Sequence, residues 1–470
     1  MRKTPEATLT GSNFPPSQEW TKEGSREQQP VKVRLVFKKG ACLVSTNTTR
    51  HSKVAFILSL LLAGLGQLYN RQLLKGFSFI ILEVAYLIAF YDLFNMGFWG
   101  LFTLGEVVRR DHSIRLLIQG ILAVIVLAFG IGFYIFNVVD AYRNGKKREE
   151  GIPLPTIKEQ FKHLYDYGFP YLMISPGLFL LIFTVVFPLI FMVLLAFTNY
   201  DLYHSPPAKL VDWVGFENFK KVFTLDIWRD TMMKVLAWTI IWTFVATTGQ
   251  IIIGIFLAVI VNQKDLKGKA IIRTILILPW AVPAFVTILI FANMFNETFG
   301  VINTSILPFF GLDAIPWMTD VNWTRTAVIL IQFWLGFPFV MAMTTGVLQA
   351  IPDDLYEAAT MDGATPWQKF RNITLPMILY ATAPILITQY TFNFNNFNII
   401  YLFNSGGPAI VGQQQAGGTD ILISWIYKLT LNSAQYSIAA AITLILGIII
   451  VTFAVIQFKR TRSFKEEDLM

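Results

Sequence analysis

The sequence predicts an all-α, polytopic membrane protein. Of its 470 residues, 54% are hydrophobic and 15% aromatic, while only 14% are charged, and the mean hydropathy is +0.54. A chain of this composition places most of its surface against hydrocarbon or other apolar helices. Its apolar residues also gather in long runs, and a helix needs about 20 such residues to cross a bilayer. We therefore predict about eight transmembrane helices.

The predicted spans follow one another along the chain. They cover residues 76–95, 114–139, 172–198, 233–261, 271–295, 326–350, 373–397 and 434–458. A shorter apolar piece, from Val54 to Tyr69, could span the membrane, re-enter it or lie at its surface. Because it is short and contains Gly64, Gly66 and Gln67, we favour a segment that does not span. We expect kinks in the spans at prolines 188, 279, 283, 338 and 384.

Basic residues in short loops orient the spans, because cytoplasmic loops are enriched in lysine and arginine. Such residues cluster in 143–162, 264–273 and 459–465, which we expect on the cytoplasmic side together with both termini. The loops 96–113 and 199–232 are also basic, yet the number of spans places them outside. We follow the number of spans, because it also puts the polar loop 352–376, whose pattern is described below, on the cytoplasmic side.

Three parts of the chain differ in composition. Residues 1–50 are polar and predict a mobile cytoplasmic tail, without the basic, apolar and small-residue order of a cleaved signal peptide. Residues 51–164 predict an N-terminal membrane segment with two spans and a charged linker, and residues 165–470 a six-helix core. We expect the lone carboxylates Glu83 and Asp140 of the first two spans at the interface rather than in a proton relay.

A short polar loop between the sixth and seventh spans carries the most specific pattern. Asp353 and Asp354 can start a helix that Gly363 ends, and Thr365 and Pro366 read as the cap and first residue of a second short helix. Two helices joined at a glycine make a stiff knob on a membrane face. The residues that define the pattern are Glu357, Ala358, Ala359, Asp362, Gly363, Leu375 and Pro376.

This loop, 352–376, resembles the EAA loop of ABC-importer permeases, where the knob docks on the ATP-hydrolysing subunit. Further motifs point the same way, namely Ser175-Pro176-Gly177, Gly215 to Phe219, Trp334 to Pro338, Asn393 to Phe397 and Gly406-Gly407-Pro408. Together they are similar to the larger membrane subunit of maltose/maltodextrin ABC importers, in the binding-protein-dependent transport permease family. Some relatives insert a folded extracytoplasmic domain after the first core span, whereas the loop 199–232 is too short for one.

The resemblance implies partners and a location. The partners are a second homologous permease subunit, an ATP-binding subunit dimer and an extracytoplasmic sugar-binding protein. The substrate is maltose or maltodextrin, and the protein lies among the lipids of a bacterial cytoplasmic membrane. A different sugar, such as a multiple-sugar, galactose-containing or glycerol-phosphate substrate, is the alternative within this class.

A candidate substrate site follows from helical spacing. Gln389, Asn393 and Asn396 lie four and three residues apart and form one stripe of the seventh span, with Phe392 beside them. The sixth span carries a second stripe of Gln332, Leu335, Gly336 and Phe339. Amides bind sugar hydroxyls and aromatic rings stack on pyranoses, so both stripes can line one sugar cavity. The alternative is that these amides hydrogen-bond neighbouring helices. Some members of the family carry Asn, Tyr and Ser where this chain has Gln332, Phe339 and Gln389. The length and linkage of the sugar therefore stay open.

Other functions find little support in the sequence. The chain has no Gly-x-x-x-x-Gly-Lys-Ser/Thr loop, so we expect energy from a separate ATPase. One cysteine, Cys42, and four scattered histidines predict no metal site and no cofactor, and no basic domain predicts nucleic-acid binding. We find no clustered nucleophile or base typical of a membrane enzyme. An ion-coupled secondary transporter would usually need functional charges within its spans.

Overall fold

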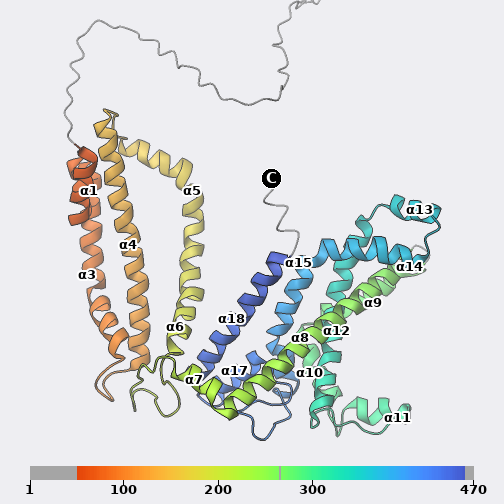
Figure 1. Ribbon diagram of the computed structural model, residues 1–470. Coiled ribbons are helices and arrows are strands. Elements are labelled where there is room, and N and C mark those ends of the chain that lie inside the picture. Colours follow the sequence, from red (N-terminus) through yellow and green to blue (C-terminus); the bar gives the residue numbers. More distant parts are fainter. Residues whose placement is uncertain (1–49, 264–265, 461–470) are drawn as a thin grey trace, which may run out of the picture. The chain divides into compact units, whose positions relative to one another are not determined.

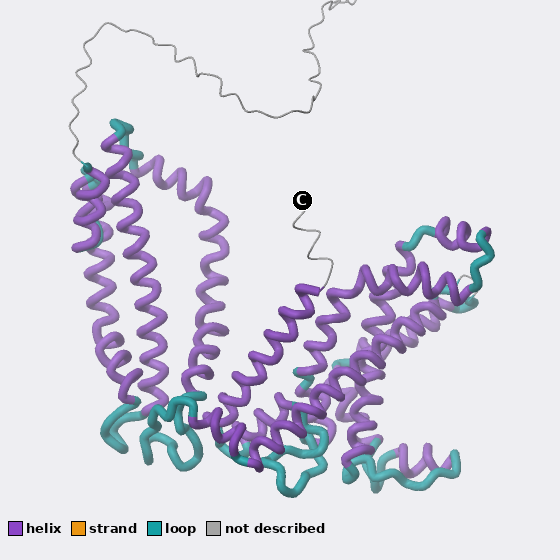
Figure 2. Tube along the Cα trace, viewed as in Figure 1, coloured by secondary structure: helices purple, strands orange, loops and turns teal. Residues whose placement is uncertain are grey.

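The computed structural model describes residues 50–263 and 266–460, and in these ranges it is built from helices without a strand (Figures 1 and 2). The predicted tail, 1–50, lies outside the described residues except for Arg50. The N-terminal membrane segment consists of α1 (His51–Leu61), α2 (Leu65–Tyr69), α3 (Leu73–Thr103) and α4 (Ser113–Glu149). The all-α prediction is confirmed.

The remaining helices follow in chain order. They are α5 (Ile157–Leu181), η1 (Ile182–Val186), α6 (Phe187–Leu195), α7 (Glu217–Thr224), α8 (Asp226–Val261), α9 (Lys269–Ala281), α10 (Ala284–Met294), η2 (Ile302–Ile306), α11 (Leu307–Phe309), α12 (Val321–Ala350), α13 (Asp353–Met361), α14 (Pro366–Lys369), η3 (Phe370–Thr374), α15 (Leu375–Phe394), α16 (Phe397–Asn404), α17 (Leu422–Leu431) and α18 (Tyr436–Arg460).

The number of spans agrees with the prediction. Seven helices of the described residues are long and apolar enough to cross a membrane, and the bent pair of α9 and α10 makes an eighth. The kink expected in the fifth span is a full break, because its two halves meet at an angle of 90°. Pro283 causes this break, since proline has no backbone N–H and pushes the preceding Val282 into the extended conformation observed there.

Proline also explains where the helices widen locally. Each π-helical turn of the described residues, η1, η2 and η3, is followed two residues later by a proline: Pro188, Pro308 and Pro376. A proline cannot donate the usual bond to the carbonyl four residues earlier, and its ring crowds that turn. A wider turn relieves the clash and keeps the helix continuous. Pro376, predicted as part of the coupling pattern, therefore sets the start of α15.

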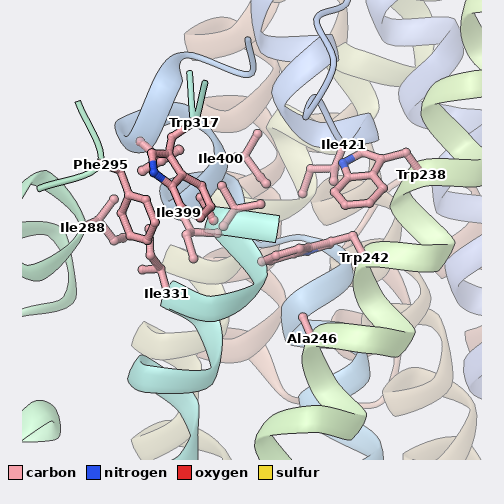
Figure 3. Packing of buried hydrophobic residues seen from close by; sticks show 13 residues of the cluster. Trp238, Trp242, Ala246, Ile288, Phe295, Trp317, Ile331, Ile399, Ile400 and Ile421 are labelled. Carbon is pink, nitrogen blue, oxygen red and sulfur yellow. The ribbon is translucent and has the colours of Figure 1, made fainter. Parts of the chain in front are cut away.

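The apolar core of the later spans centres on tryptophans of α8. Trp238 and Trp242 are buried against Ile331 of α12 and Ile399 of α16, among other residues (Figure 3). Helix α8 also packs closely on α12 through glycine. A methyl group at Gly249 would lie 2.1 Å from Phe333, and one at Gly254 would lie 2.5 Å from Val340. These two glycines bring the two helices together, which positions the polar residues described below.

The short apolar piece near the N-terminus forms a re-entrant hairpin, residues 51–69. Helices α1 and α2 have 11 and 5 residues, which is too few to span. The tip of the hairpin packs between α3 and α4, where side chains satisfy its open backbone groups. Glu83 accepts the Ala63 N–H at 2.6 Å, Asn137 accepts the Gly64 N–H at 3.1 Å, and the Tyr134 hydroxyl donates to the Leu60 carbonyl at 2.6 Å.

These bonds give the two early carboxylates roles within the fold. Glu83 caps the hairpin tip from α3, while Asp140 of α4 accepts from Lys75 Nζ at 2.8 Å and from Gln67 Nε2 at 3.1 Å. Irregular backbone at membrane depth persists only where protein groups satisfy it. The two carboxylates, isolated in the sequence, thus each have partners in the tertiary structure; their expected place at the membrane interface stays a prediction.

We predict that Glu83→Ala destabilises the re-entrant hairpin. The change leaves the Ala63 N–H unpaired, which costs about 1–3 kcal/mol. Thermal unfolding of the purified protein in detergent should show a lower midpoint. Glu83→Gln keeps an acceptor oxygen and should lose less. Asp92→Ala removes an exposed carboxylate of the same helix and should leave the midpoint unchanged; an equal loss in both alanine variants would contradict a capping role for Glu83.

Candidate functional site

Three helices contribute to a connected row of side-chain amides, which we call the amide seam: Gln250 of α8, Gln332 of α12, Gln389 and Asn393 of α15, and Asn396 just after α15. Gln250 lies at its centre. Its Oε1 accepts from Gln332 Nε2 at 2.9 Å, and its Nε2 donates to Gln389 Oε1 at 3.4 Å. Gln332 Oε1 in turn accepts from Asn396 Nδ2 at 3.0 Å.

Asn393 occupies the most enclosed position of the amide seam. Its side chain is fully buried, and its Nδ2 donates to Thr247 Oγ1 of α8 at 2.9 Å. Its Oδ1 accepts from Asn396 at 3.4 Å, and its backbone carbonyl accepts from Trp242 Nε1 at 2.9 Å. Asn393 therefore ties α15 to α8, as the structural alternative for these amides predicts, and at the same time contacts Asn396.

The turn after α15 decides how the predicted stripe continues. Helix α15 ends at Phe394, and Asn396 lies in the short break before α16. Its backbone N–H still bonds the Asn393 carbonyl at 3.2 Å, so the two amides remain neighbours although the helix has ended. Asn396 and Gln389 are half-buried, whereas Asn393 and Gln332 are buried. The side chains of Gln389 and Asn396 are therefore the amides of the seam that remain partly accessible from outside the chain.

The other predicted residues lie in different environments. Leu335 is half-buried and packs on the tryptophan core, and half-buried Phe339 makes an edge contact with Trp280 at 5.9 Å. Phe392 is exposed. Gly336 gives room to a protein group, because a methyl group there would lie 2.0 Å from Gln250 Oε1. The sixth-span stripe therefore meets the seventh-span stripe at Gln332, directly through Asn396 and indirectly through the Gln250 amide to Gln389.

Gln250 belongs to the amide seam and Thr247 contacts it, and both residues were missed in the sequence analysis. Gln250 is an amide within the apolar run 233–261, and a polar side chain inside a span usually faces a partner or a cavity. The presence of this amide in an apolar run can be read from the sequence. The partners of Gln250 cannot, because Gln332 and Gln389 lie 82 and 139 residues away along the chain.

The end of the same helices that lies away from the knob is fixed by a folded loop between α16 and α17. Asp420 is buried and accepts from Ser424 Oγ at 2.7 Å and from Lys428 Nζ. Burial raises the pKa of this carboxyl, against the opposing effects of Lys428 and the hydrogen bonds. Arg325 of α12 stacks on Trp238 at 4.2 Å and donates to the Gly418 carbonyl, which joins the loop to α8 and α12.

The knob predicted from the sequence is present. Helix α13 has acidic residues in its first turn and ends at Gly363, whose φ is +76°. The Gly363 N–H bonds the Thr360 carbonyl, and the Ala364 N–H bonds the Ala359 carbonyl, which is a Schellman ending. Thr365 then forms a capping box with Gln368 at the start of α14, with Pro366 as first residue.

Two side-chain bonds close the knob on itself. The Tyr356 hydroxyl pairs with Thr374 Oγ1 at 2.9 Å, and Lys369 Nζ donates to Thr360 Oγ1 at 2.7 Å. The predicted coupling residues Glu357, Ala358, Asp362, Gly363 and Pro376 are exposed, and Ala359 and Leu375 are half-buried. Behind the knob lies a polar pocket of about 680 Å³, lined by Lys269, Arg273 and Glu357 among others. The knob is rigid and open to a partner. Among the described residues no group of three metal-ligating side chains occurs.

We predict that Asn393→Ala destabilises the helix bundle. The change leaves Thr247 without its amide partner, at a cost of about 1–3 kcal/mol and a lower thermal midpoint. Asn395→Ala is the matched control, because this exposed amide bonds only the nearby Thr391 carbonyl among the described residues. If both variants melt like the parent protein, the seam does not hold α15 to α8.

Comparison with known families places the chain among transport permeases. The model of the family "Binding-protein-dependent transport system inner membrane component" matches residues 250–463. This range contains every residue of the amide seam and the whole knob. A crystal structure of a bacterial ABC transporter involved in the import of the acidic polysaccharide alginate shares the fold, with a TM-score of 0.54 and 23% identity over 65% of this chain and 98% of that chain.

Curated relatives match over nearly their full length. The galactooligosaccharides transport system permease protein GanP of Bacillus subtilis is 60% identical over 89% of this chain and 100% of GanP. The maltodextrin transport system permease protein MalC of Streptococcus pneumoniae is 50% identical over 91% of this chain and 99% of MalC. The corresponding protein MdxF of B. subtilis is 50% identical over 90% and 98%. The chain therefore belongs to the binding-protein-dependent transport system inner membrane components, as its knob motif predicts.

Proposed function

We propose that the chain is the membrane permease subunit of an ABC importer for oligosaccharides. The observation that carries this proposal is a direct structural link between the knob and the amide seam. The knob leads through η3 into α15 without a loop, and α15 carries Gln389 and Asn393. A movement of the knob is therefore transmitted along one helix to the place where a sugar would bind.

The proposed mechanism divides the work between this chain and its partners. A separate ATPase dimer binds the exposed knob. A second homologous permease completes the pathway, and an extracytoplasmic binding protein delivers the sugar. Closure of the ATPase moves the knob as a rigid lever and shifts the cavity between inward and outward access. Glu357 and Asp362 lie exposed on the knob for this contact. The chain supplies no chemistry of its own in this scheme.

The substrate is proposed from the amides and the relatives together. Neutral side-chain amides suit the hydroxyl groups of uncharged sugars, and Gln389 and Asn396 are the half-buried amides of the seam. We propose maltodextrins, in agreement with the names of MalC and MdxF. Galactooligosaccharides are the second candidate, favoured by the 60% identity with GanP. Leu335, Gly336, Phe339 and Phe392 would shape the same cavity together with the second permease.

Orientation and division of the chain are part of the proposal. With the knob in the cytoplasm, eight spans place both ends of the chain on the cytoplasmic side. We assign residues 165–470 to the transport core and residues 51–164 to an accessory membrane segment. The non-helical stretch 152–156 between α4 and α5 supports a boundary shortly before residue 165, because it separates the two sets of helices.

Gly363→Pro tests the lever. Proline cannot adopt a φ of +76°, and it removes the N–H that bonds Thr360, so the Schellman ending is lost. The variant should insert at the normal level while sugar uptake and sugar-stimulated ATP hydrolysis collapse. Gly151→Pro is a matched control, because Gly151 has a φ of +68° and ends α4 with the same pair of bonds, to Arg148 and Lys147. Normal uptake by Gly363→Pro would exclude the knob as the coupling element.

Asn396→Ala tests the sugar site. If the Asn396 amide binds a sugar hydroxyl, its loss should weaken binding by about 1–3 kcal/mol, a factor of roughly 5–150 in affinity. Sugar binding to the purified complex with its binding protein is the measurement, and Asn395→Ala is the control. Asn393→Ala should weaken sugar binding as well, because Asn393 contacts Asn396. Normal transport by both variants at normal expression would make the seam purely structural.

Competition between sugars identifies the substrate. Complexes in vesicles, supplied with ATP and the binding protein, should take up labelled maltodextrin, and unlabelled maltodextrin should compete. Stronger competition by galactooligosaccharides would select the second candidate. Vesicles without the ATPase should accumulate no sugar under a proton or sodium gradient. Accumulation there would favour a secondary transporter instead.

A further inference from the structure

The loop between the fifth and sixth spans presents an apolar surface that no part of the described chain covers. We call residues 299–312 the outer aromatic loop; it contains η2 and α11 and lies at the end of α12 opposite the knob (Figure 1). Phe309 is 84% exposed, Phe310 68%, Phe299 66% and Leu312 55%. Exposed apolar side chains gathered in one short segment mark a surface that meets another apolar phase.

The polar groups at the base of this loop turn inward. Asn303 is buried, donates to the carbonyls of Glu297 and Ile315, and accepts from the Ile315 N–H and from Trp317 Nε1. Glu297 accepts from the backbone N–H groups of Met318 and Thr319 at 2.7 and 2.8 Å. Burial acts to raise the pKa of Glu297, but these hydrogen bonds outweigh it and lower the pKa. Hydrogen bonds of Glu297 and Asn303 therefore hold the base of the loop in place, while Phe309 and Phe310 form its exposed apolar tip.

The composition of the loop selects lipid over protein as its partner. Residues 298–312 contain no Asp, Glu, Lys or Arg. Around the phenylalanines the exposed polar side chains are the uncharged Thr298, Thr304 and Ser305 and the flanking Asp313, while Glu297 and Asn303 are occupied within the base. The loop also follows α10, whose Phe285, Leu289 and Ile290 are exposed as on a lipid-facing helix. Phenylalanine and leucine are typical of the apolar face with which interfacial segments enter the acyl region.

We propose that the outer aromatic loop inserts into the bilayer leaflet at this end of the spans, which is the outer leaflet in the orientation proposed above, and anchors the connection between α10 and α12. The phenylalanines lie among the upper acyl chains, as the apolar side chains of interfacial segments do. The loop thus holds the outer end of the broken fifth span at a fixed depth. This is a lipid-binding surface in a loop that connects two predicted spans.

Depth-dependent fluorescence quenching tests this insertion. In a Cys42→Ser background the chain has no other cysteine, so Phe309→Cys can carry a single environment-sensitive NBD label. The complete complex is placed in phosphatidylcholine vesicles that contain lipids with a nitroxide near the headgroup. The emission of the label at position 309 should shift to the blue, lose intensity with the nitroxide lipid, and resist iodide added outside.

Val411→Cys provides the matched control. Val411 lies at the tip of the loop between α16 and α17 and is completely exposed, at 102%. Its label should be quenched by iodide and unaffected by the nitroxide lipid. Strong iodide quenching at position 309 would overturn the proposal. So would protection from both quenchers that appears only when the binding protein is added, because that outcome identifies a protein interface. Leu312→Cys repeats the measurement at a second position of the loop.

Discussion

Polar groups inside a bilayer must find their partners within the protein, because hydrocarbon offers neither donors nor acceptors. Both polar assemblies in the spans of this chain follow from that constraint. In the N-terminal segment, Glu83, Asn137 and Tyr134 satisfy the backbone at the tip of the re-entrant hairpin. In the later spans, Gln250 satisfies Gln332 and Gln389 at once. Removing one partner in either place leaves the other unpaired in an apolar environment, which is why single substitutions there carry a large cost.

The same constraint shapes how a sugar would be held in the proposed function. Asn393 uses its amide for Thr247 and Asn396, so it is committed to packing α15 against α8. Asn396 and Gln389 are half-buried, and each makes bonds that a sugar hydroxyl could replace. A seam of this kind combines two roles that the sequence presents as alternatives. Its buried members position the helices, and in the proposed function its half-buried members would offer amides to the pathway completed by the second permease.

Proline placement links the seam to the knob. Pro376 follows the π turn η3 and allows the chain to pass from the knob into α15 without an intervening loop. Pro283, in contrast, has no preceding π turn, and the fifth span there bends by 90°. One proline thus lies in a helix that runs without interruption from the knob into α15, while the other divides a span into two parts. The outer aromatic loop lies beyond the divided span, where an anchor in the bilayer would fix the position of its free end.

The sequence by itself determined the class of fold, the number of spans and the knob. These features depend on local physics: long apolar runs, the cap at Thr365 and the left-handed conformation that Gly363 tolerates. The sequence also identified four of the five amides of the seam, because a polar residue within an apolar run is easily recognised. Only the tertiary structure decided their partners. Glu83 meets Ala63 across a hairpin that the sequence left ambiguous, and Gln250 meets residues 82 and 139 positions away. Pairings between distant segments depend on how whole helices pack, and packing of α8 on α12 rests on contacts such as that of Gly249 with Phe333, which no local pattern encodes.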